Sequence, residues 1–169
     1  MTVLVTGASG TLGQPLLTRL SQDGTSTRAV VHRPQSAAAV KELALPGVDV
    51  IATDLTDEAA TAKLLDGIDA VFLVTANVDN QLAQEKSVIR AAAAQDVRRL
   101  VKISVGGAAP DAPLTIARVH YAAEQELAAS GLTHTILRPA FFMNNLLQYI
   151  PWIEPSGQLR LPWAKAPWP

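Results

Sequence analysis

The chain of 169 residues carries a formal net charge of −1, with 49% hydrophobic and 17% charged residues. These values are typical of one ordinary globular domain, without the basic footprint that nucleic acid or an anionic membrane requires. The absence of cysteine excludes thiolate nucleophiles, zinc–thiolate sites and redox disulfides. Because the sequence also has no basic leader and no apolar run of membrane-spanning length, it predicts a cytoplasmic protein without nucleic-acid or membrane partners.

Short β-branched apolar runs alternate along the chain with longer stretches rich in alanine and leucine. This alternation predicts an α/β fold, a Rossmann-type doubly wound parallel sheet with helices on both faces. Asp57 is suited to a helix N-cap, and Gly131 to the residue that follows a helix. Strands are expected at residues 2–6, 27–32, 48–52, 70–74, 100–104 and 133–137, and helices at 11–22, 35–45, 57–65, 79–95 and 114–130.

The end of the chain differs in composition, because five prolines and all three tryptophans lie from Pro151 onward. Such a segment is not expected to form a packed element. Its aromatic side chains, Trp152, Trp163 and Trp168, would expose apolar surface unless they cover the sheet or meet a partner, for which a homodimer is one solution. We therefore expect one domain over residues 1–150, followed by a tail over residues 151–169.

Three glycines follow the first expected strand with the spacing G-x-x-G-x-x-G and open the first expected helix. In a strand-to-helix turn of this kind the backbone approaches a pyrophosphate, and the free N–H groups of the helix N-terminus bind it. The spacing is a variant of the usual dinucleotide fingerprint, and the alternative is a glycine turn that binds nothing. Gly7 is expected to make the tight turn, Gly10 to allow close approach, and Gly13 to pack the helix on the strand. The candidate cofactor-binding residues of this segment are Gly7, Ser9, Gly10, Thr11, Leu12 and Gly13.

The end of the second expected strand carries Arg33, at the place where an NAD-selective protein presents an acidic residue to the ribose. A guanidinium there suits a 2′-phosphate and predicts NADP in preference to NAD, and the less favoured alternative for Arg33 is a solvated surface residue. Past the third expected strand, Asp54 and Leu55 are candidates for the adenine rim. The alternative for Asp54 is a turn residue that precedes Asp57.

Several blocks of the chain resemble, in order, the NmrA-like group of atypical short-chain dehydrogenases, which includes NADPH-dependent quinone and triphenylmethane-dye reductases. The blocks are residues 5–13, 31–33, 69–74, 101–104, 120–124, 130–132, 135–139 and 141–145, so the resemblance covers about residues 1–150. It implies a longer fold with a smaller C-terminal substrate lobe, of which residues 151–169 would be the start. It also implies that Val74, Thr75 and Ala76 pass beneath the cofactor. By the same resemblance, Pro139 and Phe141 border the nicotinamide, and Phe142 and Asn145 face the substrate.

The Ser-Tyr-Lys triad of short-chain dehydrogenases is incomplete in this sequence. Ser104 ends the fifth expected strand and Tyr121 lies on the next helix, but the residue four positions later is Gln125, which cannot lower the pKa of a phenol. The resemblance points instead to His120 in place of the tyrosine, with Glu124 one turn later orienting its imidazole. A solvated helix pair is the alternative for these two residues.

No catalytic or metal-binding role is expected for the remaining polar candidates. Lys102 shares the strand side of Ser104, and a surface role is expected for it. His32 and His134 lie at strand positions without clustered acidic partners, so the three histidines predict no metal site.

Two functions remain open from the sequence. The first is NADPH-dependent reduction of a quinone-like or other electron-poor small molecule, which needs little help from a catalytic acid. The alternative is a regulatory protein that senses NADP(H) without catalysis, and the missing Tyr-x-x-x-Lys motif favours it. A sugar-nucleotide epimerase is less favoured, because it would need that motif.

Overall fold

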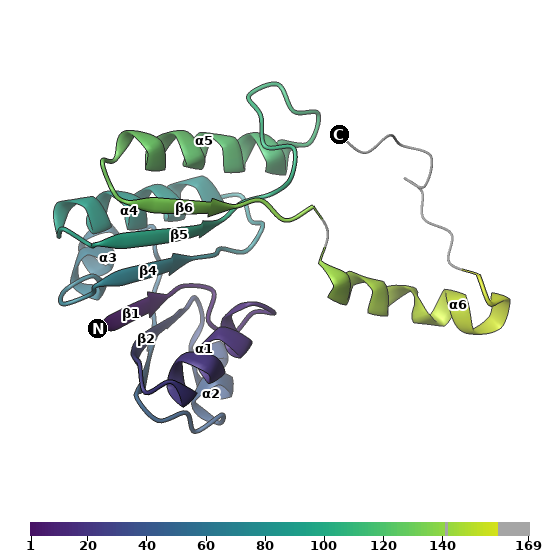
Figure 1. The fold of residues 1–169 in the computed structure, drawn as a ribbon, viewed down its shortest axis with the longest axis horizontal. Coiled ribbons are helices and arrows are strands. Elements are labelled where there is room, and N and C mark those ends of the chain that lie inside the picture. The colour runs from purple at the N-terminus through teal and green to yellow at the C-terminus, as the bar shows by residue number, and fades with distance from the viewer. Residues whose placement is uncertain (141, 159–169) are drawn as a thin grey trace. The chain divides into compact units, whose positions relative to one another are not determined.

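The computed structural model describes residues 1–140 and 142–158 of the chain (Figure 1). It divides into two compact units, Met1–Arg138 and Pro139–Pro169. The strands of the first unit are β1 (Thr2–Val5), β2 (Ser26–Val31), β3 (Val48–Ala52), β4 (Ala70–Leu73), β5 (Arg99–Ile103) and β6 (His134–Leu137). Its helices are α1 (Gly13–Gln22), α2 (Pro34–Lys41), α3 (Glu58–Leu64), α4 (Gln81–Ala94) and α5 (Thr115–Ala129).

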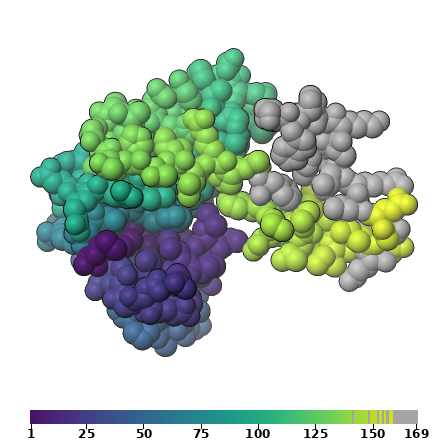
Figure 2. Space-filling view, viewed as in Figure 1, coloured from purple at the N-terminus to yellow at the C-terminus, as the bar shows by residue number. Residues whose placement is uncertain are grey.

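All six strands form one parallel sheet in the order β3-β2-β1-β4-β5-β6, which confirms the expected doubly wound fold. The chain first builds β2 and β3 on one side of β1, then crosses to place β4 on the other side. In the space-filling view, the half with β1–β3 and the half with β4–β6 form one continuous body (Figure 2).

Alternation along each strand divides the core into two layers. Val3 and Val5 of β1 belong to an apolar cluster with Leu17 of α1 and residues of α2, whereas Leu4 belongs to a second cluster with Val88 of α4 and residues of α3 and α5. Successive strand side chains point to opposite faces, so each layer of helices has its own apolar partner surface. Helices α1 and α2 cover one face of the sheet, and α3, α4 and α5 cover the other (Figure 1).

The helix boundaries differ from expectation by a few residues where the local backbone chemistry decides them. Leu12 is the N-cap of α1, so the first helix begins two residues later than expected. Helix α2 ends at Lys41, and Ala44 beyond it has a positive φ of 49° that interrupts a helix. Asp57 accepts a hydrogen bond from the backbone N–H of Ala60, which confirms the expected N-cap of α3.

The second unit contains a 3₁₀ helix over Met143–Tyr149 and the helix α6 over Ile150–Ser156. The expectation of no packed element from Pro151 onward is therefore wrong for this segment. Pro151 lies in the first helical turn, where its missing N–H is not needed, and the helix ends at Gly157 with a φ of 62°. The side chain of Trp152, together with Trp163 and Trp168, lies outside the described residues. Among those described, no helix has the length and apolar character needed to cross a bilayer.

Candidate functional site

The site lies where the strand order reverses, at the carboxyl ends of β1 and β4. In an open α/β sheet this reversal leaves a crevice that is the usual place for a ligand. The hydroxyl of Thr6, just after β1, donates to the carbonyl oxygen of Val74 at 2.7 Å and accepts from the Val74 N–H at 2.8 Å. These two bonds join the start of the glycine loop to the segment of Val74, Thr75 and Ala76 that follows β4.

The three glycines of the loop differ in how much space a side chain would have at each position. Gly7 has a φ of 56°, and a Cβ there would lie 2.8 Å from the carbonyl oxygen of Val74. A Cβ on Gly13 would lie 2.4 Å from the carbonyl oxygen of Gly7, so the helix could not approach the strand with any larger residue. Gly10 is exposed, and its Cβ would meet only the Gly7 carbonyl oxygen, at 3.2 Å. Packing of the protein itself thus requires Gly7 and Gly13, while Gly10 leaves open space beside the loop.

The loop presents backbone donors to this open space. Within the described part of the chain, the N–H groups of Thr11, Leu12 and Gly13 have no backbone acceptor. Thr11 is exposed, and Ser9 contributes its carbonyl oxygen to a 3.0 Å hydrogen bond from the Gln14 side chain, which holds the loop shape. Unpaired donors at the start of a helix, with the positive end of the helix dipole, fit the pyrophosphate of a dinucleotide.

Arg33 lies after β2, which neighbours β1 in the sheet, and occupies the N-cap position of α2. It is exposed, and none of the ion pairs in the described part of the chain includes its guanidinium. Its charge is therefore available to an anion. This position agrees with both interpretations of Arg33 from the sequence.

Asp54 and Leu55 lie in different environments, the first exposed and the second buried. The Asp54 carboxylate accepts a 2.9 Å hydrogen bond from the backbone N–H of Thr56, which lowers the pKa of this carboxyl group. Asp54 is thus a turn residue, and it is exposed after β3. Leu55 is only 8% exposed and belongs to the core beneath α3 and α4, so Asp54 is the member of the pair that faces solvent.

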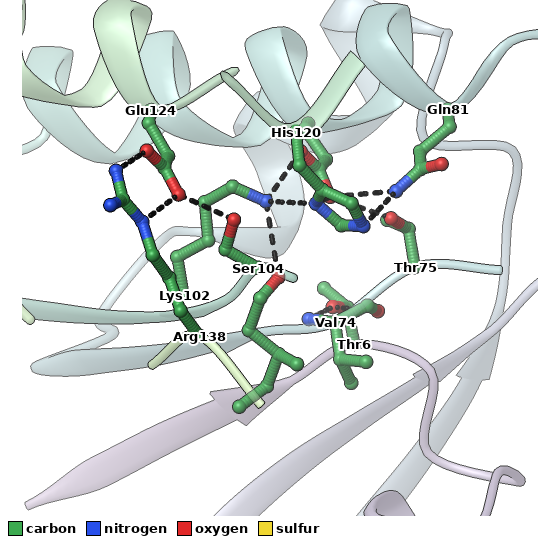
Figure 3. A network of polar contacts seen from close by, with 11 residues as sticks. Thr6, Val74, Thr75, Gln81, Lys102, Ser104, His120, Glu124 and Arg138 are labelled. Atoms are coloured by element: carbon green, nitrogen blue, oxygen red, sulfur yellow. Dashed lines mark hydrogen bonds and ion pairs between the residues drawn. The ribbon is translucent and has the colours of Figure 1, made fainter. Parts of the chain in front are cut away.

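A buried polar network lies at the carboxyl ends of β4 and β5, beneath α4 and α5 (Figure 3). Lys102 of β5 forms a 2.7 Å ion pair with Glu85 of α4, and both side chains are completely buried. The surface role expected for Lys102 is therefore wrong, because Lys102 shares the strand face of Leu100 and faces the helices instead of water. Thr75, from the segment after β4, donates to the other oxygen of Glu85 at 2.7 Å.

His120 joins this network from α5. Its Nδ1 lies 3.2 Å from the Lys102 ammonium nitrogen, and its Nε2 lies 3.2 Å from the side-chain nitrogen of Gln81 on α4. Burial lowers the pKa of His120, and the adjacent charge of Lys102 lowers it further. With 8% of its surface exposed, His120 is not half of a solvated helix pair.

Glu124 forms a second cluster on the same helix. It accepts a 2.5 Å hydrogen bond from the Ser104 hydroxyl and two hydrogen bonds from Arg138. The expectation that Glu124 orients the imidazole is wrong. The oxygens of Glu124 bind Ser104 and Arg138, whereas the ring of His120 is contacted by Lys102 and Gln81. Burial opposes ionisation of Glu124, but the bonds from Arg138 and Ser104 outweigh it and hold its pKa below the ordinary value.

The engagement of Ser104 limits its chemistry. Its one hydroxyl hydrogen is directed at Glu124, so the oxygen can accept a hydrogen bond but has no proton to offer a substrate carbonyl in this arrangement. Ser104 is also only 4% exposed.

The residues expected around the nicotinamide and substrate belong partly to the second unit. Pro139 begins that unit, and the exposed Phe142 accepts a hydrogen bond at its carbonyl oxygen from the N–H of Asn145, at 2.9 Å. Phe141 lies outside the described residues. The roles of these four residues remain predictions.

Sequence reasoning missed Gln81, Glu85 and Arg138 as members of the polar clusters. A signal was present for two of them: Gln81 and Glu85 are one helical turn apart and continue into the buried apolar positions Val88 and Ile89 of the same face. Polar side chains at the start of an otherwise apolar stripe indicate a buried polar partner. For Arg138 the sequence carries no comparable signal.

Comparison with known proteins agrees with this geometry. Residues 7–150 match the profile of a family described as NAD(P)H-binding. The chain belongs to this family. The match confirms the resemblance inferred from the glycine loop and the later blocks.

Among relatives of this NAD(P)H-binding chain, an NAD(P)H azoreductase of Xenophilus azovorans is 34% identical over 160 residues, 95% of this chain and 55% of the relative. A (4-alkanoyl-5-oxo-2,5-dihydrofuran-3-yl)methyl phosphate reductase of Streptomyces griseus is 37% identical over 166 residues, 98% of this chain and 56% of the relative. A crystal structure of the NADPH-dependent quinone oxidoreductase of Escherichia coli with NADPH has a TM-score of 0.76 and 30% identity, covering 92% of this chain and 54% of that one. The chain thus spans about half the length of these relatives.

Proposed function

We propose that the chain binds NADPH at the carboxyl edge of its sheet and takes part in hydride transfer to a quinone-like or other electron-poor small molecule. The observation that carries the proposal is the loop from Gly7 to Gly13, which combines open space at Gly10 with unpaired N–H groups at the start of α1. The names of the relatives support the reaction class, since they include an azoreductase and a quinone oxidoreductase.

Different segments of the chain would bind different parts of the dinucleotide. The N–H groups of Leu12 and Gly13 would hold the pyrophosphate, and Thr75 and Ala76, after β4, would lie beneath the cofactor. The dinucleotide supplies the hydride, while the protein orients it and excludes competing reactions. Hydride transfer to a quinone gives a hydroquinone anion that can take its proton from solvent, so this chemistry does not depend on a strong acid at His120.

Selectivity for NADP over NAD follows from the unpaired Arg33 in this proposal. An arginine binds a phosphate through two parallel N–H···O bonds, and the exposed guanidinium that follows β2 would bind the 2′-phosphate in this way. The Escherichia coli relative is described as NADPH-dependent, which supports the same choice.

A second function, NADP(H) sensing without turnover, is favoured by one specific observation. Ser104 directs its hydroxyl hydrogen to Glu124, and the residue four positions after Tyr121 is Gln125, so no proton donor of the short-chain dehydrogenase type is in place. A sensor needs the binding loop but not such a donor.

One pair of measurements separates the two functions. Calorimetry with NADPH and NADP tests binding, and the loss of NADPH absorbance with a panel of quinones and azo compounds tests turnover. Binding with acceptor-dependent oxidation supports the reductase, whereas binding without oxidation by any acceptor supports the sensor. Absence of binding contradicts both.

A further inference from the structure

The environment of the buried Lys102 ammonium accounts for each of its three protons. Its nitrogen lies 2.7 Å from Glu85 Oε2, 3.1 Å from the carbonyl oxygen of Ile103 and 3.2 Å from Nδ1 of His120. An ammonium has three N–H donors and no lone pair, so three acceptors satisfy it completely. A buried lysine with fewer acceptors would carry a large desolvation penalty.

This arrangement restricts the protonation of His120. Because the ammonium can only donate, Nδ1 of the imidazole must accept, and the proton of the neutral ring must then lie on Nε2. An imidazolium would direct a second donor at the ammonium over 3.2 Å, with two like charges in contact.

We propose that Lys102, held by Glu85, is a positioning residue that fixes His120 as a neutral imidazole with its proton on Nε2. As a statement about the NADPH site, this rests on the function proposed above, although the tautomer itself does not. The side-chain nitrogen of Gln81 faces Nε2 at 3.2 Å. The same nitrogen donates a long hydrogen bond of 3.4 Å to Glu85 Oε1. A half-turn of the amide gives up this long bond and exchanges the nitrogen and oxygen, so that the oxygen accepts the Nε2 proton.

The charges around the ring act in opposite directions. Lys102 on β5 disfavours protonation of His120, while Glu85 on α4, with one oxygen 4.0 Å from Nδ1, and Glu124 on α5 favour it. Glu85 is paired with Lys102, and Glu124 is paired with Arg138, so both carboxylates already neutralise another cation. Burial, the largest contribution, also lowers the pKa of the ring.

The consequence for the site is that His120 is held uncharged, with its one N–H donated to Gln81. The ammonium that short-chain dehydrogenases place four residues after their tyrosine is here supplied by a strand, and it acts on an imidazole. His120 would therefore hold Gln81 in place and would not serve as a charged acid near neutral pH.

The test is long-range ¹H–¹⁵N NMR of the histidine rings in the protein without dinucleotide. The chain has three histidines, so the His120 signals are identified by their loss in His120→Gln. We expect the Nε2–H tautomer, persisting to a pH below 6.5 because the pKa of His120 is lowered. The Nδ1–H tautomer would overturn the proposal, because it requires a neutral Lys102 that accepts from the ring.

Variants test whether Lys102 determines the tautomer of His120. Removing Lys102 alone leaves a buried carboxylate unpaired and endangers folding, so the informative variant is Lys102→Met combined with Glu85→Gln, which removes both charges. In this double variant the His120 pKa should rise toward 6.5 and the Nδ1–H tautomer should appear. Unchanged His120 signals in the folded double variant would refute a positioning role.

Lys86→Met combined with Glu126→Gln is the matched control, because it also removes a paired lysine and glutamate, here a pair that is partly exposed. It should leave the His120 tautomer and pKa unchanged, and an equal shift in this control would overturn the assignment to Lys102. Since no dinucleotide is present, failure of NADPH binding would count against the proposed function alone.

Discussion

At the scale of single residues, two arginines near the carboxyl edge of the sheet have opposite surroundings. Arg138 is bound to the buried carboxylate of Glu124, whereas the exposed Arg33 has no ion pair among the described residues. A paired guanidinium stabilises its own protein, and an unpaired one is available to a ligand. The same residue type therefore leads to two kinds of prediction.

Arg33→Ala should weaken the binding of NADP by about 1.5–3 kcal/mol, the usual value of a hydrogen bond to a charged group. The affinity for NAD should change little, because NAD lacks the 2′-phosphate. Calorimetry with both nucleotides measures the difference. Arg19→Ala is the control, since Arg19 is an exposed arginine near the other end of α1. Equal losses for NAD and NADP would contradict the assignment.

Glu124→Gln should lower the free energy of unfolding at neutral pH by about 1–3 kcal/mol and flatten its dependence on acid pH. The pKa of Glu124 lies below its ordinary value of 4.5, so the folded state binds fewer protons than the unfolded state. The stabilisation is then complete above pH 4.5 and is lost as the pH falls through the lower, folded-state pKa.

Urea unfolding at several pH values measures this effect. Glu42→Gln, at an exposed carboxylate without an ion pair in the described part of the chain, should leave the acid limb unchanged. An acid limb as steep in Glu124→Gln as in the unmodified chain would show that other carboxyl groups determine it.

At the scale of elements, the turn between β1 and α1 combines a packing requirement with a binding opportunity. Gly13 allows the first turn of α1 to lie directly against the backbone of Gly7 and Ala8. Gly10, in the same loop, has more space and faces outward. Alanine at these two positions should therefore have separable effects on stability and on ligand binding.

Gly13→Ala should destabilise the protein by at least about 1–3 kcal/mol, the usual range for overpacking. Its Cβ would lie 2.4 Å from the carbonyl oxygen of Gly7 and 2.6 Å from Cα of Ala8, and these backbone atoms can move only together with β1 and α1. Chemical denaturation measures the loss. A midpoint equal to that of the unmodified chain would show that the turn is looser than the structure indicates.

Gly10→Ala should leave the free energy of unfolding nearly unchanged but weaken NADPH binding by tenfold or more, about 1.4 kcal/mol. Its Cβ needs a shift of only a few tenths of an ångström from the Gly7 carbonyl oxygen, but it projects into the space assigned to the pyrophosphate. Calorimetry together with denaturation distinguishes the two effects. Unchanged affinity would remove the loop from the proposed site.

At the scale of the whole molecule, the two units carry different parts of the proposed function. The glycine loop, Arg33, Asp54 and the segment after β4 all lie in Met1–Arg138, whereas the residues expected to face the substrate lie in Pro139–Pro169. Binding of the dinucleotide and reduction of an acceptor should therefore respond differently to removal of the second unit.

A chain that ends after Arg138 should keep its affinity for NADPH within a few-fold and lose acceptor-dependent oxidation. It retains the Arg138–Glu124 pair and every strand of the sheet, but lacks Phe142 and Asn145. Calorimetry and the acceptor assay, run on both chains, measure the two properties. Loss of NADPH binding in a folded truncated chain would show that Pro139 and the residues after it contribute to the cofactor site.

Features that depend on neighbours along the chain were predictable before the fold was known. Alternating apolar runs predicted the parallel sheet, because side-chain periodicity follows directly from strand and helix geometry. The glycine spacing located the turn after β1, and Asp57 was correctly identified as the N-cap of α3. Each of these follows from local backbone chemistry.

The contacts between polar side chains, in contrast, depend on elements that are distant along the chain. Lys102 is separated by 17 residues from Glu85 and by 18 from His120, and 14 residues separate Glu124 from Arg138. Local rules couple residues three or four apart, so they were consistent with the pairing of His120 with Glu124 that the resemblance implied, and they gave no partner for Lys102. The packing of α4 and α5 on β5 instead enclosed Lys102 away from water, and a buried ammonium must take whatever acceptors the neighbouring elements present.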